Sequence, residues 1–129
     1  MKTIKQVYHI KAPLEKVWQA LVDPKVMDEW SGGPAKMTAK EGSSFSLWGG
    51  DIHGTNLEIV DKSTLVQEWY SGEWPHPSKV SFTLANDKGE TKVELLHENV
   101  PKEDADDIAE GWDIYYLGVI KEFLEKKRA

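Results

Sequence analysis

The sequence predicts an α+β fold, in which a curved antiparallel sheet of six or seven strands packs around one long helix near the C-terminus. Two observations predict it. Between residues 35 and 100, short stretches rich in strand-forming residues are separated by turn sequences. Residues 103–127 then place apolar side chains at steps of three and four, the period of an amphipathic helix. Because sheet and helix must each bury an apolar face, we expect one domain over residues 1–129.

A strand and two short helices open the chain. Residues 3–11 alternate, with Ile4, Tyr8 and Ile10 on one side, as in a half-buried strand. Pro13 suits the first turn of a helix, which we expect over residues 14–21. Asp23 before Pro24 is typical of a helix cap, so a second short helix is expected to follow.

Six more strands are expected before the long helix. Their ranges are 35–39, 44–48, 52–61, 64–71, 79–85 and 90–100. The turns between them are short, and residues 86–89 form a hairpin turn whose Gly89 accepts a positive φ. Short turns favour an antiparallel meander, and the helices at the two ends of the chain must cover one of its faces.

The long helix carries an aromatic stripe. Its predicted buried face consists of Ile108, Trp112, Tyr115, Val119 and Phe123, widened by Tyr116, Ile120 and Leu124. Carboxylates favour the start of a helix and cations its end, as at Glu103, Asp104, Asp106, Asp107 and at Lys126, Lys127, Arg128. Gly111 and Gly118 each cost about 1 kcal/mol relative to Ala. We therefore expect a structural reason for them, either a close backbone approach or a bend at Gly111.

Composition excludes several classes of protein. The chain has no Cys, which excludes disulfides, thiolate nucleophiles and cysteine metal sites. It has neither an apolar run long enough for a membrane span nor a signal-peptide core, so we expect a soluble cytoplasmic protein. The net charge of −6 arises in residues 65–129, which hold 14 acidic and 8 basic side chains. Nucleic acid and anionic membranes are therefore poor partners. The acidic half either steers the chain to a basic protein or only solvates an exposed helix.

Aromatic residues supply the candidate binding site. Six Trp are many for 129 residues, and their rings either line a pocket between helix and sheet or fill that space completely. The candidate lining residues are Trp18, Trp30, Phe45, Trp69, Tyr70, Phe82, Trp112, Tyr115 and Val119. Tyr70 or Tyr115 could offer the polar contact that orients a ligand. Trp74 and His76, in a proline-stiffened loop, are candidate contacts for a partner, unless Trp74 packs back over the sheet edge.

No catalytic or metal constellation is visible. The four His residues lack ligand spacing, and we expect His9 and His97 on the outer face or an edge of the sheet. Glu58, Glu68 and Glu94 lie in strands, where alternation could turn one of them inward as an acid or base, although an outward carboxylate is the ordinary arrangement. No nucleophile elbow or phosphate loop occurs. We therefore expect no catalytic residue, metal or cofactor.

Several stretches resemble a known family. These are residues 50–54, 65–70 followed by Glu73-Trp74-Pro75, 87–91, and Gly111-Trp112 with Tyr115-Tyr116 and residues 118–121. Ala12-Pro13 with Val17-Trp18, and Trp30 before a Gly/Pro loop, extend the similarity over essentially the whole chain. The sequence resembles the helix-grip domains of the START and birch-pollen-allergen superfamily and, more narrowly, the C-terminal domain of the activator of heat shock protein 90 ATPase. The full cochaperone carries a separate N-terminal domain, of which we expect no counterpart here.

The resemblance implies a helix-grip fold and leaves three functional hypotheses. The first is a non-catalytic interaction module of the activator type, with a chaperone or other protein as partner and a role in stress response. The second is carriage of a small apolar molecule in the cleft between helix and sheet. The third is an enzyme of the cyclase or hydrolase kind that the superfamily sometimes hosts, although fold alone does not establish activity.

Overall fold

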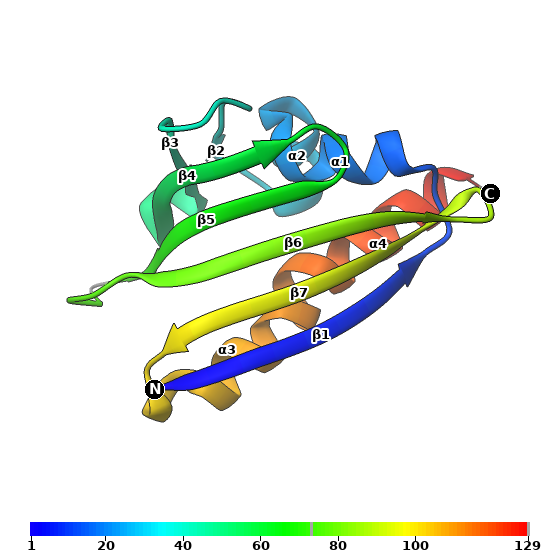
Figure 1. Ribbon diagram of the computed structural model, residues 1–129. Coiled ribbons are helices and arrows are strands. Elements are labelled where there is room, and N and C mark those ends of the chain that lie inside the picture. Colours follow the sequence, from blue (N-terminus) through cyan, green and yellow to red (C-terminus); the bar gives the residue numbers. More distant parts are fainter. Residues whose placement is uncertain (73, 129) are drawn as a thin grey trace.

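The computed structural model describes residues 1–72 and 74–128, with side chains up to Lys126 (Figure 1). Glu73 and the side chains of Lys127 and Arg128, which entered the sequence predictions, lie outside this part. The strands are β1 Lys2–Ile10, β2 Ala35–Lys36, β3 Ser44–Leu47, β4 Ile52–Val60, β5 Thr64–Ser71, β6 Ser78–Asp87 and β7 Glu90–Val100. The helices are α1 Leu14–Val22, α2 Pro24–Ser31, α3 Ala105–Gly111 and α4 Leu117–Arg128. Short 3-10 turns occur at Trp48–Gly50 and Lys102–Asp104, and a π-helical segment, Trp112–Tyr116, joins α3 to α4.

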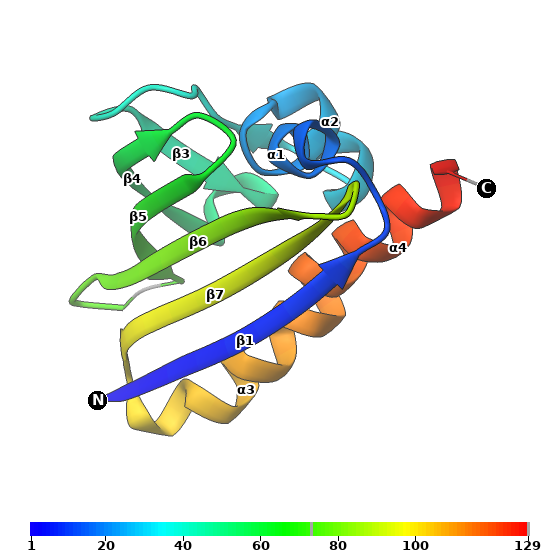
Figure 2. The ribbon, with the colours of Figure 1, turned by 45° about the vertical axis from the view of Figure 1, so that its right-hand side comes forward.

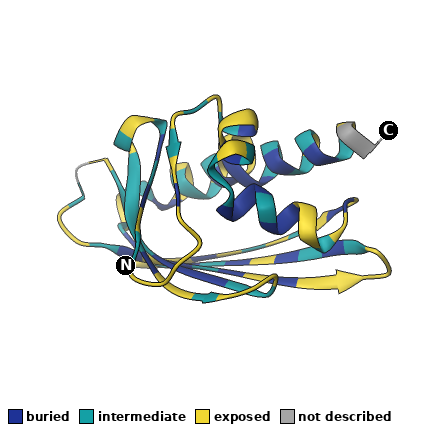
Figure 3. Cartoon of the chain, turned by 90° about the horizontal axis from the view of Figure 1, so that it is seen from above, coloured by how far each residue is buried: buried dark blue, intermediate teal, exposed yellow. Residues whose placement is uncertain are grey.

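The strands form one antiparallel sheet in the order β1-β7-β6-β5-β4-β3-β2. The meander from β2 to β7 follows the chain, and β1 adds to its end by pairing with β7. The helices lie on one face of the curved sheet, and α3 and α4 run along it as a single rod (Figures 1 and 2). Seen along the sheet, buried residues fill the layer between sheet and helices (Figure 3). The predicted α+β fold is confirmed, with seven strands.

Local sequence explains where elements begin and end. The Asp23 side chain accepts a hydrogen bond from the Lys25 N–H at 3.0 Å, which caps α2 as predicted. Lys88 and Gly89, with φ of 53° and 85°, form the two-residue turn between β6 and β7. The φ values are those of a type I′ turn, which matches the twist of the strands it joins.

The buried face of the long helix differs from the predicted one. Trp112, Tyr116, Leu117, Ile120 and Leu124 are buried, whereas Tyr115 is 63% exposed and Val119 is only half-buried. The cause is the π-helical segment Trp112–Tyr116, called the π turn below, in which the Leu117 N–H donates to the Trp112 carbonyl five residues earlier. One additional residue in a turn rotates the face of α4 by about 100°. The prediction that Tyr115 belongs to the buried stripe is therefore wrong, whereas Val119 packs against the margin of the core.

The π turn also explains one of the two helix glycines. A Cβ at Gly118 would overlap the carbonyl oxygen of Asp113, which the wide turn brings against it. A Cβ at Gly111 would meet only Tyr115 Cδ2, at 3.8 Å. The predicted close backbone approach thus holds for Gly118 alone, and the neighbouring backbone belongs to the same helix.

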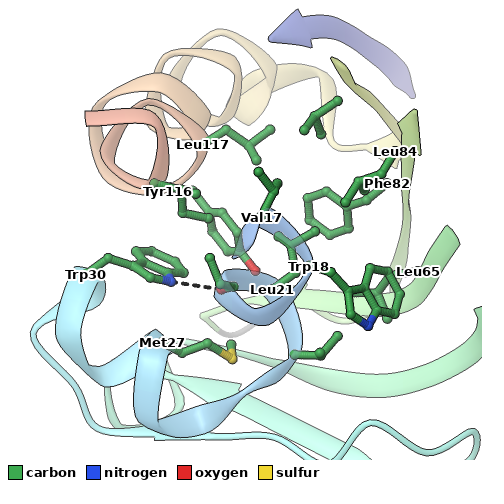
Figure 4. Packing of buried hydrophobic residues seen from close by; sticks show 14 of the residues in the cluster. Val17, Trp18, Leu21, Met27, Trp30, Leu65, Phe82, Leu84, Tyr116 and Leu117 are labelled. Carbon is green, nitrogen blue, oxygen red and sulfur yellow. Dashed lines mark hydrogen bonds between the residues drawn. The ribbon is translucent and has the colours of Figure 1, made fainter. Parts of the chain in front are cut away.

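The main core lies between α1, α2, α4 and the sheet. Figure 4 shows Tyr116 and Leu117 from the long helix meeting Phe82 and Leu84 from β6. The indole N–H of Trp30 donates to the Ala20 carbonyl at 2.8 Å, so this buried donor is satisfied. Trp18, Trp30, Phe45 and Phe82, all predicted as pocket walls, are at most 6% exposed and belong to this core.

Candidate functional site

A pocket of about 220 Å³ adjoins this core, where α3 and the π turn approach β4 and β5. Its lining residues come from the 3-10 turn and the start of β4, from β5, from α3 and from the π turn. They are Trp48, Ile52, Trp69, Ser71, Asp107, Ile108, Gly111, Trp112, Tyr115 and Tyr116. Five of these ten residues are aromatic. This set, called the aromatic pocket below, is the candidate site.

The rings of the aromatic pocket also contact one another. Trp69 and Trp112 stack with centroids 5.2 Å apart and planes 23° apart, so β5 and the π turn share one aromatic stack. Tyr116 lies 4.7 Å from Trp112 and crosses Trp48 at 81°. Because these contacts join three separate elements, the shape of the pocket is set by tertiary packing and not by one mobile loop.

A buried histidine lies behind the pocket wall. His97, on β7, is completely buried, and its Nδ1 lies 3.1 Å from the Trp112 indole nitrogen. Indole is a donor only, so Nδ1 accepts this bond and Nε2 must carry the proton. Nε2 therefore donates to the Ser78 hydroxyl at 2.7 Å, and that hydroxyl donates to the Trp69 carbonyl at 2.8 Å. The chain of bonds thus holds the Trp112 ring through its indole N–H and ties it to the backbone of Trp69, the residue on which it stacks.

The Ser78–His97 pair has the distance of a nucleophile and its base, but its geometry does not permit that chemistry. A base needs a free lone pair toward the hydroxyl, and the lone pair of His97 points at Trp112 instead. Burial also lowers the pKa of His97 to about 3, so the ring is neutral at physiological pH. The pair is a structural element of the pocket wall.

The expectation that His97 lies on the outer face or an edge is wrong. Val93, Leu95 and His97 share the parity of β7, and all three point toward the helix. This alternation was the signal that could have placed His97 inside. His9 does lie outside, 3.9 Å from Asp87.

The aromatic pocket contains only some of the predicted lining residues. Trp69, Trp112 and Tyr115 line it, and exposed Tyr115 forms part of its rim. Tyr70 lies on the opposite face of the sheet, because it follows Trp69 directly on β5, and it stacks on His53 there at 5.1 Å. Tyr70 therefore cannot orient a ligand in the cleft. Val119 lines a different groove on the helix.

Other lining residues were absent from the predicted set. Tyr116 appeared only at the margin of the predicted helix stripe, because the π turn cannot be seen in the apolar pattern. Trp48 belongs to a short turn before β4, where no periodicity indicates its direction. Asp107 was assigned only to the charge of the helix start.

Of the two predicted partner contacts, Trp74 lies beside the pocket. Trp74 is half-buried, its ring lies 6.4 Å from Trp69, and its indole N–H donates to Asp104 Oδ2 at 3.0 Å. It thus packs back onto the core, as the alternative prediction had it, and ties its loop to the start of the long helix. His76 is exposed.

The electrostatics of this region are acidic. The start of the long helix exposes Glu103, Asp106, Asp107, Glu110 and Asp113, against one cation, Lys102, over residues 102–113.

Inside the protein, two polar atoms of the described side chains, Trp69 Nε1 and Gln67 Oε1, are buried without a hydrogen-bond partner. Within the described residues no group of three His, Asp or Glu side chains could hold a metal ion. None of the described helices is both long and apolar enough to cross a bilayer.

Comparison with known proteins gives a consistent result. A family model described as "Activator of Hsp90 ATPase homolog 1-like protein" matches residues 11–125. The activator of 90 kDa heat shock protein ATPase homolog 2 of Mus musculus is 24% identical over 114 residues, which cover 87% of this chain and 34% of the mouse protein. The chain spans about a third of the length of the first curated relatives it matches, 36% and 34%.

Solved structures agree with this family. The crystal structure of an HSP90 activator from Plasmodium falciparum superimposes with a TM-score of 0.88 at 25% identity, covering 97% of each chain. The solution structure of the Aha1 dimer from Colwellia psychrerythraea gives a TM-score of 0.84 at 22% identity and covers all of both chains. The second likeness shows a shared fold.

Proposed function

Because the chain belongs to the family of Activator of Hsp90 ATPase homolog 1-like proteins, we propose that it is a non-catalytic interaction module whose partner is a chaperone of the Hsp90 type. The observation that carries this proposal is the match over residues 11–125, together with the similarity to an HSP90 activator over nearly the whole of both chains. A role in stress response follows from such a partner. The proposal concerns this domain alone and makes no statement about the remaining length of the longer relatives.

The contact surface in this proposal is the rim of the aromatic pocket. Asp107, one of the exposed carboxylates at the start of the long helix, lines the pocket, and Trp74 contacts the pocket residue Trp69 and the helix-start residue Asp104. Charges of one sign on a partner-facing surface raise the association rate with a surface of opposite charge and orient the encounter. Aromatic side chains in a partly buried setting supply the attraction once the charges have brought the surfaces together.

A non-catalytic role agrees with the chemistry of the described interior. The one close serine–histidine pair is locked by Trp112, as described above. A pocket of about 220 Å³ is also smaller than the roughly 300–1,000 Å³ of usual sites for drug-sized ligands. The size of the pocket therefore favours a protein partner over carriage of a bulky apolar molecule.

The test is binding to a purified Hsp90-type chaperone, measured by calorimetry with and without nucleotide, together with the steady-state ATPase rate. We expect saturable binding that weakens with salt and a changed ATPase rate. The variant Asp107→Lys/Glu110→Lys should bind less well. Glu15→Lys/Glu122→Lys, which changes the net charge equally at exposed sites outside this rim, should bind normally. No binding and no change of rate at about 100 μM protein would overturn the proposal.

A further inference from the structure

We propose that the aromatic pocket is a binding site for an organic cation, specifically a methylated ammonium group. Five aromatic residues and one acidic residue, the exposed Asp107, line its space of about 220 Å³. The faces of Trp and Tyr rings carry negative electrostatic potential and attract cations, which is the basis of the aromatic cages that hold quaternary ammonium groups. This inference does not depend on the identity of the protein partner.

The charge of the lining favours a cation over an anion. Among the described lining residues, Asp107 is the only charged one, and none is basic. The neighbouring helix residues add further carboxylates outside the pocket, such as Asp106 and Glu110. An anionic ligand would meet repulsion from Asp107 without a compensating donor, whereas a cation gains from both the rings and the carboxylate.

Methylation of the ammonium group follows from the shortage of acceptors. A primary ammonium carries three N–H donors, and each must find an acceptor when it leaves water. Besides Asp107, the lining offers only the hydroxyls of Ser71, Tyr115 and Tyr116 as side-chain acceptors, and the remaining walls are apolar or aromatic. A trimethylammonium group has no N–H to satisfy and presents methyl groups to those walls.

The size of the space agrees with such a group. A cavity of about 150 Å³ holds a benzene molecule, so about 220 Å³ admits a trimethylammonium group together with the first carbons of its chain. Tyr115, 63% exposed at the rim, leaves the outer end of such a chain in solvent. The group could belong to a free small molecule or to a methylated lysine side chain of a protein.

The test is a pair of isosteric probes, choline and the neutral 3,3-dimethyl-1-butanol, titrated against the whole chain and followed by the NMR signals of the indole N–H groups. We expect choline to bind at least about tenfold more tightly and to shift the signals of Trp48 and Trp69. Equal binding of the two probes would overturn the cation site and leave an apolar pocket. Binding of neither choline nor the peptide described below would overturn the site altogether.

Two exposed carboxylates give a matched control. Asp107→Asn should weaken choline binding about three- to tenfold, whereas Asp106→Asn should leave it unchanged, because Asp106 lines a separate groove beside β1. Equal effects of the two variants would contradict the placement of the site. A trimethyllysine peptide, compared with the same peptide carrying norleucine, distinguishes the sources: tighter binding than choline supports a protein side chain, and weaker binding supports a free small molecule.

Discussion

The two glycines of the long helix should respond to the same substitution with opposite signs. In a regular α-helix, replacing Gly by Ala stabilises the folded state by about 1 kcal/mol. Gly111 has room for a Cβ, since the nearest atom would be Tyr115 Cδ2 at 3.8 Å. Gly111→Ala should therefore raise the free energy of unfolding by about 0.5–1 kcal/mol.

Gly118→Ala should lower the free energy of unfolding. The new Cβ would overlap the Asp113 carbonyl oxygen unless the π turn tightens. Tightening would rotate Leu117 and Ile120, both fully buried, away from the core. Forcing atoms into filled space costs about 1–3 kcal/mol, and a backbone carbonyl yields less readily than a side chain, so the upper part of that range applies. After subtraction of the propensity gain, a net loss of about 1–2 kcal/mol remains.

Urea denaturation of the two variants beside the parent chain measures both effects, with the slope m checking that the unfolded surface is unchanged. A Gly118→Ala variant as stable as Gly111→Ala would refute the π turn, and with it the assignment of the buried helix face.

Three further outcomes follow from the pocket wall and its support. Trp112→Ala should lower the free energy of unfolding by about 3–5 kcal/mol for the lost ring and by about 1–3 kcal/mol more because His97 Nδ1 is left without a donor. Tyr115→Ala, at an exposed position, should lower it by under about 1 kcal/mol. Urea denaturation of the two variants compares these losses. The pKa of His97 falls from its usual value near 6.5 to about 3 on folding. The contribution of the neutral ring to the free energy of unfolding is therefore complete above pH 6.5 and is lost as the pH falls toward 3. Between those values stability should drop by about 1.4 kcal/mol per pH unit more in the parent chain than in His97→Gln, and parallel pH profiles would contradict this. Asp104→Ala should cost about 0.5–1.5 kcal/mol by removing the acceptor of the Trp74 indole, and Asp104→Asn, which keeps an acceptor oxygen, should cost less; the Trp74 indole N–H signal in NMR reports the lost bond.

Alternation along the strands accounts for what the sequence could predict. The period of two placed Val80, Phe82 and Leu84 on the buried face of β6, where the structure has them. The same alternation on β5 places Tyr70 and Trp69 on opposite faces of the sheet, and on β7 it places His97 on the buried face. These two errors arose because polar or partly polar side chains were assigned by residue type instead of by parity.

The helix face could not have been predicted in the same way. After Trp112, two apolar sets are compatible with helical spacing. The first consists of Tyr115, Val119 and Phe123, and the second contains Tyr116 and Ile120. Only the contacts of Tyr116 with Trp30 and Phe82, at 4.9 and 5.9 Å, select the second. The π turn results from this tertiary packing, so local sequence contains no direct signal for it except the otherwise costly Gly118.

The six tryptophans allow a direct test of the claim that the chain binds its partner at the rim of the aromatic pocket. Each indole N–H gives one NMR signal, which can be followed while an unlabelled Hsp90-type chaperone is added. We predict that Trp74 and Trp48 change first, since both lie at or beside the pocket, and that Trp30, bonded to the Ala20 carbonyl inside the core, stays unchanged until the whole molecule broadens. Early changes confined to Trp18 and Trp30, or none at all under saturating chaperone, would contradict the account.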